Sequence, residues 1–261
     1  MSSSRTLPAA GPRTLPIWAK HLQSLFFPLV GTTFLLTGPH VWWLALLFFL
    51  PLLLAYRLDT RGPDEPRQPH GSTPAWPFDA LVYALAAVQL LNIGLLANMY
   101  AQQRLLSMDV LMAFIVVGAS SGFSIVTAHE LIHRGKKWEQ QLGRLLLCTV
   151  FYEHFYTEHL RGHHVRVGTP EDPATARFGE SFLAFYRRTV PGQFRSAWNL
   201  ERKRLGDPDM KLTDSRLLRS RVVQGLLVGG ALPGSSSSLR GRSPWWLFYS
   251  RHSPPPGCSR W

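Results

Sequence analysis

Long apolar segments alternate with short polar connections over the first half of the chain. Four such segments cover residues 22–37, 41–56, 81–99 and 110–127. Crossing a membrane takes about 20 apolar residues in a helix, so the last two segments have a suitable length and the first two are short. The pattern therefore predicts membrane helices rather than the core of a large soluble domain.

Small residues and prolines refine this prediction. Gly38-Pro39 separates the first two segments, which we expect to form a tight hairpin. Pro51 is predicted to kink the second segment. The run of small residues 118–122 (GASSG) suits close helix packing in lipid.

The second half of the chain is less regular. A fifth apolar stretch, 142–156, is interrupted by Arg144, Glu153 and His154 and predicts a re-entrant or interfacial helix, or the entry to a spanning one. A sixth starts at Val222 and is predicted to stop near Gly229. The fold class predicted is all-α: a multi-pass transmembrane helix bundle of four to five spanning or re-entrant helices.

Composition divides the chain into three parts. Residues 1–16 are rich in Ser, Pro and Arg and predict a disordered N-terminal tail without a secretory signal peptide. Residues 17–228 form the predicted membrane domain. Residues 229–261 combine serine, proline and arginine and predict a disordered tail.

The chain of 261 residues is 46% hydrophobic and only 17% charged, with a net charge of +12. Soluble domains carry about 25% charged residues. In a membrane protein the basic excess is typical of cytoplasmic segments, so we exclude nucleic acid as a partner. The two cysteines, Cys148 and Cys258, are too few for a disulfide framework, a zinc ribbon or an iron–sulfur cluster.

Lys and Arg residues predict the orientation. They gather before the first segment, after the second and after the fourth: Arg5, Arg13, Lys20; Arg57, Arg61, Arg67; Arg134, Lys136, Lys137. With four crossings these three regions lie on one side, which should be the cytoplasmic side of the inner membrane. The histidine-rich motifs after the fourth segment fall on that side too.

Five histidines in two motifs predict a metal site. His129 and His133 are four residues apart, as are His159 and His163, and this spacing places side chains on one face of a helix. His164 adds an adjacent imidazole. Neutral imidazole binds zinc, iron and copper, and a set of histidines without cysteine suits iron. Ionisable residues at the end of a membrane helix are functional candidates.

Other polar residues near the motifs are predicted to support the ligands. Glu130, Glu153 and Glu158 are expected to orient imidazole N–H groups. The alternative for one of the three is that it bridges two metals. His154 is either a further ligand or a buried supporting residue. The remaining histidines are expected to be ordinary surface or interfacial residues: His21, His40, His70 and His252.

The first motif is also the H-E-x-x-H pattern of zinc metalloproteases, in which the glutamate is the general base. The second motif disfavours this alternative, because intramembrane proteases usually supply an aspartate where this chain supplies histidines.

The words around the motifs resemble the membrane alkane hydroxylases, within the larger superfamily of membrane fatty-acid desaturases and hydroxylases. They are 127–134 (TAHELIHR), 158–164 (EHLRGHH), 169–174 (TPEDPA), 179–182 (GESF), 190–192 (VPG) and 197–201 (AWNLE). Desaturases share the histidine motifs in looser form but lack the third and fourth of these words. The similarity is densest over 124–205.

The resemblance implies a six-helix bundle with a histidine-held, non-haem diiron centre. It implies oxidation of the terminal carbon of an alkane to a primary alcohol with O2 and electrons from rubredoxin and rubredoxin reductase. The apolar substrate would enter from the bilayer. Carried over residue by residue, the implied ligands are His129, His133, His159, His163 and His164.

Two family elements have no counterpart here: a histidine in an N-Y-x-E-H-Y-G word and a third, H-x-x-H-H motif. The sequence contains no histidine between His164 and His252. We therefore expect at most one iron and no turnover. We hypothesise that a frameshift near residues 229–233 has replaced the last helices of the family's bundle and its third histidine motif. The alternative is a naturally short form.

Two other functions stay open. One is a desaturase or hydroxylase acting on an acyl chain, or a monooxygenase acting on an alkylaromatic. The other is a catalytically dead membrane protein that binds one metal ion weakly or none.

Overall fold

The computed structural model describes residues 16–61, 73–102 and 107–234, and every regular element in these ranges is helical. This confirms the all-α class for the described residues. In chain order the elements are α1 (Ile17–His21), η1 (Leu22–Leu25), α2 (Phe26–Thr37), α3 (Trp42–Leu47), α4 (Leu50–Arg61), α5 (Trp76–Ala101), α6 (Ser107–Ile132), α7 (Lys137–Thr149), α8 (His154–Glu158), η2 (His159–His163), α9 (His164–Arg166), α10 (Phe182–Arg204), η3 (Ser215–Arg219) and α11 (Arg221–Gly234).

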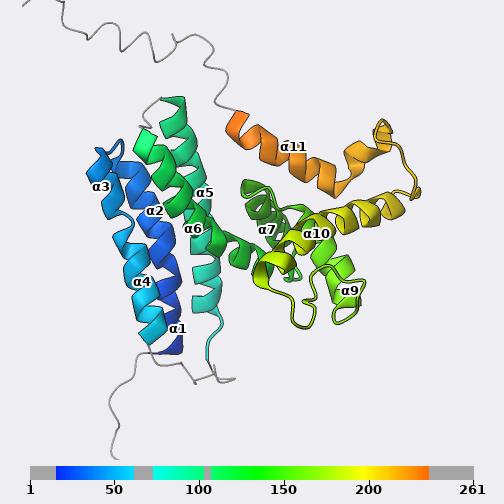
Figure 1. The fold of residues 1–261 in the computed structure, drawn as a ribbon, viewed down its shortest axis with the longest axis horizontal. Helices are drawn as coiled ribbons and strands as arrows, with labels where there is room; N and C mark the ends of the chain where they lie inside the picture. Colours follow the sequence, from blue (N-terminus) through cyan, green and yellow to red (C-terminus); the bar gives the residue numbers. More distant parts are fainter. Residues whose placement is uncertain (1–15, 62–72, 103–106, 235–261) are drawn as a thin grey trace, which may run out of the picture.

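The helices form two groups (Figure 1), with α1 to α6 side by side and α7 to α11 gathered to one side of them. In the first group, Phe34 of α2 and Met112 of α6 are buried in one apolar cluster. A second cluster joins the end of α6 to α7 through Leu131 and Leu146. Helix α6 therefore belongs to both groups.

Among the described residues, two helices, α5 and residues 108–132 of α6, are long and apolar enough to cross a membrane. The other predicted crossings are shorter in the structure. Helix α2 has 12 residues and ends at Thr37, and a turn at Phe48 and Phe49 separates α3 from α4. A bundle with four to five crossings therefore remains a prediction.

The predicted kink at Pro51 is wrong. Pro51 is the second residue of α4, where a helix does not use the backbone N–H that proline lacks. The break in this apolar segment comes earlier, at the turn of Phe48 and Phe49.

The small residues at 118–122 do not make the expected close contact through glycine. A Cβ added at Gly118 or Gly122 would meet nothing within 4 Å. The close approach comes instead from Gly31 of α2, where an added Cβ would lie 3.6 Å from Ser120 Cβ and 3.2 Å from Asn92 Nδ2.

His40 is also placed differently from its prediction as a surface or interfacial residue, because it is only 2% exposed. After Gly38-Pro39 the chain turns toward the start of α6, where Asp109 is fully buried. His40 Nδ1 lies 2.9 Å from Asp109 Oδ1, and the backbone N–H of His40 donates to both carboxylate oxygens at 3.2 Å. The pair ties the hairpin to α6.

The fifth apolar stretch is not one helix. Helix α7 ends at Thr149, Phe151 has a left-handed φ of 54°, and α8 starts only at His154. The prediction of a stop near Gly229 is wrong as well, because α11 continues to Gly234. Gly229 packs against the end of α7, where an added Cβ would lie 3.1 Å from the carbonyl oxygen of Cys148.

The predicted tails lie largely outside the described residues. This applies to residues 1–15 and 235–261, and to His70 and His252. His21 is exposed, as expected.

Candidate metal centre

The first histidine motif forms the end of α6 and is held from behind by α7. The two helices meet at Gly143, where an added Cβ would lie 2.8 Å from Ile132 Cγ2 and 2.9 Å from the carbonyl oxygen of Ala128. Only glycine permits this approach. It fixes the helical turn that carries His129 and His133.

The turn that follows α6 is held by Arg134. Its guanidinium donates to Asp79 of α5 at 2.7 Å and to Glu139 of α7 at 3.1 Å. Tyr83 of α5 also donates to Glu139 through a short hydrogen bond. One arginine thus links three helices beside the histidines, and Glu139 is only 4% exposed.

The second histidine motif lies on a π-helical turn, η2. A π-helix pairs residues five apart, so His159 and His164 face the same side. Gly162 permits this turn, because an added Cβ would overlap the carboxylate of Glu158. Glu158 is fully buried and pairs with Arg166 at 3.0 Å.

Three imidazoles from the two motifs lie close to that of His159. The Nε2 atom of His159 lies 2.8 Å from that of His129 and 2.9 Å from that of His133. It lies 3.1 Å from that of His164. Ligand atoms of three of these residues, His129, His133 and His159, all lie within 4.8 Å of one another, as a metal site requires.

These contacts are unfavourable without a cation. An imidazole nitrogen carries either one proton or one lone pair in the plane of the ring. His159 Nε2 can therefore form one good hydrogen bond rather than three. Metal–nitrogen bonds of about 2.0–2.1 Å place ligands at right angles about 2.9 Å apart. The nitrogens of His129, His133, His159 and His164 therefore fit a bound transition metal.

His163 lies beside this group and is oriented by an aspartate. Its Nδ1 is 2.8 Å from Asp172 Oδ2, and its ring stacks on that of His159 with 5.4 Å between centroids. Asp172 is itself fixed by Thr175 at 2.6 Å and is 1% exposed. Carboxylate–histidine pairs commonly support metal ligands. Sequence reasoning missed Asp172, although it stands in one of the family words.

Desolvation and the neighbouring imidazoles favour the neutral form of His159 and His133. Desolvation, followed by the neighbouring histidines, lowers the pKa of His159 to about 3. Desolvation and His129 also lower the pKa of His133. Neutral rings keep the lone pairs that bind metals.

The other predicted supporting residues lie at the edge of the centre. Glu130 is exposed and contacts Arg134 at 3.5 Å. Glu153 pairs with Arg144 at 2.7 Å and is 3% exposed, and His154 is 8% exposed. No hydrogen bond joins any of these three, or Glu158, to a clustered imidazole within the part of the chain that the structure describes. Their proposed roles remain predictions.

An all-helical chain with apolar helices and a histidine centre at the end of one of them is typical of membrane-bound, metal-dependent oxidoreductases. Residues 107–248 match the family model described as fatty acid desaturase. Helix α6, with the first motif at its end, and all elements after it lie in this range.

Named relatives are more specific. The chain is 33% identical to alkane 1-monooxygenase 1 of Alcanivorax borkumensis over 174 residues, 65% of this chain and 43% of that protein. It is 51% identical to alkane 1-monooxygenase 1 of Pseudomonas aeruginosa over 81 residues, 31% of this chain and 21% of that protein. A relative from Acinetobacter baylyi is 38% identical over 128 residues, 47% of this chain and 31% of that protein.

The chain belongs to the alkane hydroxylase family within the fatty acid desaturase superfamily. It spans less than half the length of these relatives.

Proposed function

We propose that this chain forms the histidine-bearing part of an iron-dependent alkane monooxygenase, which oxidises the terminal carbon of an alkane to a primary alcohol. The observation that carries the proposal is the convergence of His129, His133, His159 and His164, at N···N distances of 2.8, 2.9 and 3.1 Å from His159. Iron would supply the activation of O2 that an inert C–H bond requires.

The chain's own residues position the centre. His129 lies in the last turns of α6, whose preceding turns are mostly apolar, and we propose that an apolar substrate reaches it from the bilayer. Asp172 orients His163, and the Glu158–Arg166 pair fixes the π-helical turn. These contacts preorganise the site, which is the protein's main contribution in a cofactor enzyme.

The ligand set supports one iron rather than two. Ligand atoms of His129, His133 and His159 form one group, His164 contacts His159 at 3.1 Å, and His163 is the other histidine of the motifs. We therefore propose that the chain binds at most one iron and does not turn over by itself. The alternative is a catalytically dead membrane protein that binds one metal ion weakly or none.

Partners and location follow from the family and from charge. We propose that rubredoxin, reduced by rubredoxin reductase, supplies the electrons, and that the centre lies at the cytoplasmic face of the inner membrane. Arg134, Lys136 and Lys137 directly follow α6, and basic residues are typical of cytoplasmic loops.

Iron analysis of the purified chain tests the centre. We expect measurable iron, at no more than one per chain, in the wild type and almost none in His159→Ala, whereas His21→Ala, at an exposed histidine on α1, keeps the wild-type content. Absence of iron binding in the wild type, or an unchanged content in His159→Ala, would contradict the proposed centre. Two irons per chain would contradict the single-iron proposal.

A chimera tests the substrate. Residues 1–234 joined to the C-terminal remainder of the Alcanivorax relative, with rubredoxin and its reductase, should convert octane to octanol, and the same chimera with His133→Ala should not. A product formed from a fatty acid but not from octane would favour the desaturase alternative. Octanol formed by the unmodified chain would refute the proposed lack of turnover.

A further inference from the structure

Four aromatic rings form a nearly parallel stack that runs through the metal centre. The ring of His159 lies between those of Phe155 and His163, with centroids 4.6 and 5.4 Å away and interplanar angles of 18° and 16°. Tyr152 continues the stack beyond Phe155, at 5.4 Å and 21°. These residues are three or four positions apart in the chain, a spacing that places side chains on one face of a helix.

The other imidazoles of the centre meet His159 in a different way. The rings of His129, His133 and His164 are inclined to it by 65°, 80° and 88°. Their contacts are made at the edge of the His159 ring, where their Nε2 atoms approach its own Nε2 at 2.8, 2.9 and 3.1 Å. The two faces of the His159 ring are therefore covered by Phe155 and His163, and its edge is left to the ligand atoms.

Hydrogen bonds do not fix the plane of this ring. Metal-binding histidines almost always donate their second ring N–H to a carboxylate, a carbonyl or water, and His163 Nδ1 has such a partner in Asp172 Oδ2 at 2.8 Å. Within the part of the chain that the structure describes, His159 Nδ1 has no protein partner, since every hydrogen-bond contact of this imidazole involves Nε2. The plane of the His159 ring therefore depends on the rings that stack against it.

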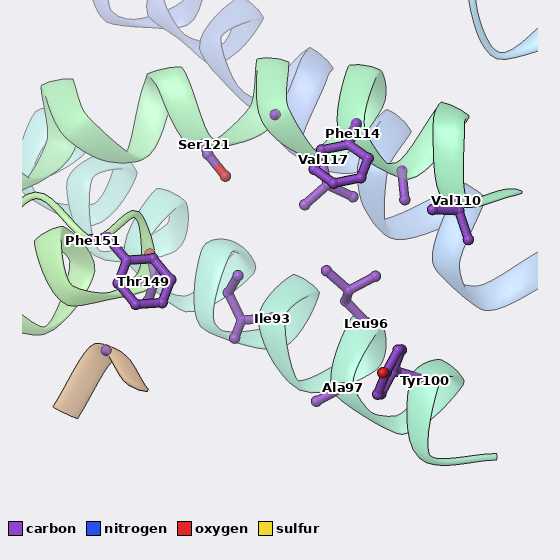
Figure 2. A pocket seen from close by; sticks show the side chains of 13 residues that line it. Ile93, Leu96, Ala97, Tyr100, Val110, Phe114, Val117, Ser121, Thr149 and Phe151 are labelled. Atoms are coloured by element: carbon purple, nitrogen blue, oxygen red, sulfur yellow. The ribbon is translucent and has the colours of Figure 1, made fainter. Parts of the chain in front are cut away.

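Both ends of the stack are attached to other parts of the fold. Asp172 holds His163 at one end. At the other end the Tyr152 hydroxyl donates to Gln193 of α10, which is only 5% exposed. The preceding residue, Phe151, has a φ of 54° and lies on another surface, where its ring lines an apolar groove between α5 and α6 (Figure 2). The stack thus connects α10 to the metal centre.

We propose that Phe155 and Tyr152 are positioning residues for the metal ligand His159. Phe155 sets the plane of the imidazole, and Tyr152 holds Phe155 in place through its bond to Gln193 of α10. The role in metal binding rests on the proposed function, whereas the stack itself requires no metal. The two parts of the inference can therefore be tested separately.

Nuclear magnetic resonance of the metal-free full chain, labelled at histidine with ¹³C and ¹⁵N, tests the stack. Protons above the face of an aromatic ring resonate upfield, so the ring signals of His159, identified by their loss in His159→Gln, should be shifted upfield in the wild type. Phe155→Leu should move them downfield, and Phe155→Tyr, which keeps the ring, should not. Unchanged His159 signals in Phe155→Leu would overturn the proposal.

The same measurement tests the attachment to α10. Tyr152→Phe keeps the ring and loses the hydrogen bond to Gln193, so it should move the His159 signals in the same direction as Phe155→Leu, by a smaller amount. Signals identical to those of the wild type would show that Tyr152 does not position the ligand.

Cobalt binding tests the effect on the centre. In a titration of the full chain with Co²⁺, Phe155→Leu should weaken the affinity about two- to tenfold, the loss expected of one aromatic pair, and should change the visible d–d spectrum. Leu142→Ala is the matched control, because it removes an apolar contact from the same cluster without touching the stack. It should lower Tm and leave the spectrum unchanged.

Wild-type affinity and a wild-type spectrum in Phe155→Leu would refute the positioning role. The same spectral change in Leu142→Ala would show a general loss of structure and refute it as well. Absence of cobalt binding by the wild type would instead contradict the proposed metal centre, and the histidine signals would then decide whether Phe155 sets the His159 ring.

Discussion

The contact between α6 and α7 is close enough for one methyl group to disturb it. In Gly143→Ala the new Cβ would lie 2.8 Å from Ile132 Cγ2, 2.9 Å from the carbonyl oxygen of Ala128 and 3.0 Å from Leu131 Cβ. Two of these atoms belong to backbone or sit next to it, so a side-chain rotation cannot relieve the overlap. Overpacking of this kind costs about 1–3 kcal/mol.

Replacing a helical glycine by alanine also has a favourable effect, about 1 kcal/mol of helix propensity. Gly94→Ala isolates that effect, because its Cβ meets nothing within 4 Å. The difference between the two variants is therefore the packing cost alone, about 2 kcal/mol, or about 4–8 °C in Tm for a domain of this size.

Thermal unfolding of both variants in the same detergent, followed by circular dichroism, measures this difference. We also expect weaker metal binding in Gly143→Ala alone, since Ala128 and Ile132 flank the histidines of the first motif. A Tm of Gly143→Ala equal to or above that of Gly94→Ala would refute the close contact and the support that it gives the centre.

Three further changes probe buried carboxylates. Burial raises the pKa of Glu153 from its ordinary value of 4.5 to about 7. The contribution of Glu153 to wild-type stability should therefore fall by about 3 kcal/mol as pH rises from 4.5 through 7. Glu153→Gln should lack this loss, so its Tm should rise relative to that of the wild type between pH 5 and pH 8. Asp172→Ala frees His163 and should weaken metal affinity about 10- to 100-fold in a competition titration, whereas Asp209→Ala, an exposed carboxylate, should not; equal affinities would show that the carboxylate does not support the site. Asp109→Ala removes the carboxylate bound by a buried histidine and should cost about 3 kcal/mol of stability, so an unchanged unfolding temperature would contradict the buried pair.

Apolar segment lengths were enough to predict α5 and α6, because both are long and uninterrupted. They were not enough for the first hairpin, where the break falls at Phe48 and Phe49, two residues that carry no turn signal. The burial of His40 was also missed, since it depends on Asp109, 69 residues away in the chain. Local patterns do not contain such pairings.

The candidate site was predicted in composition but not in arrangement. Spacing alone pointed to His159 and His163 as partners on one helical face, whereas the structure pairs His159 with His164. The chain there is a π-helix, for which the sequence offers little local signal beyond Gly162. Asp172 was missed because a carboxylate in a loop gives no periodic pattern.

The π-helical turn limits how far this centre can be transplanted. In an ordinary α-helix two residues five apart point about 140° away from each other, so His159 and His164 would no longer meet. A peptide carrying the second motif alone, free to relax to α-helical geometry, would lose the pairing although every ligand were present. A smaller metal-binding protein based on this motif therefore needs more than the histidines. It also needs the contacts that stabilise the π-helical turn, including the buried Glu158–Arg166 pair.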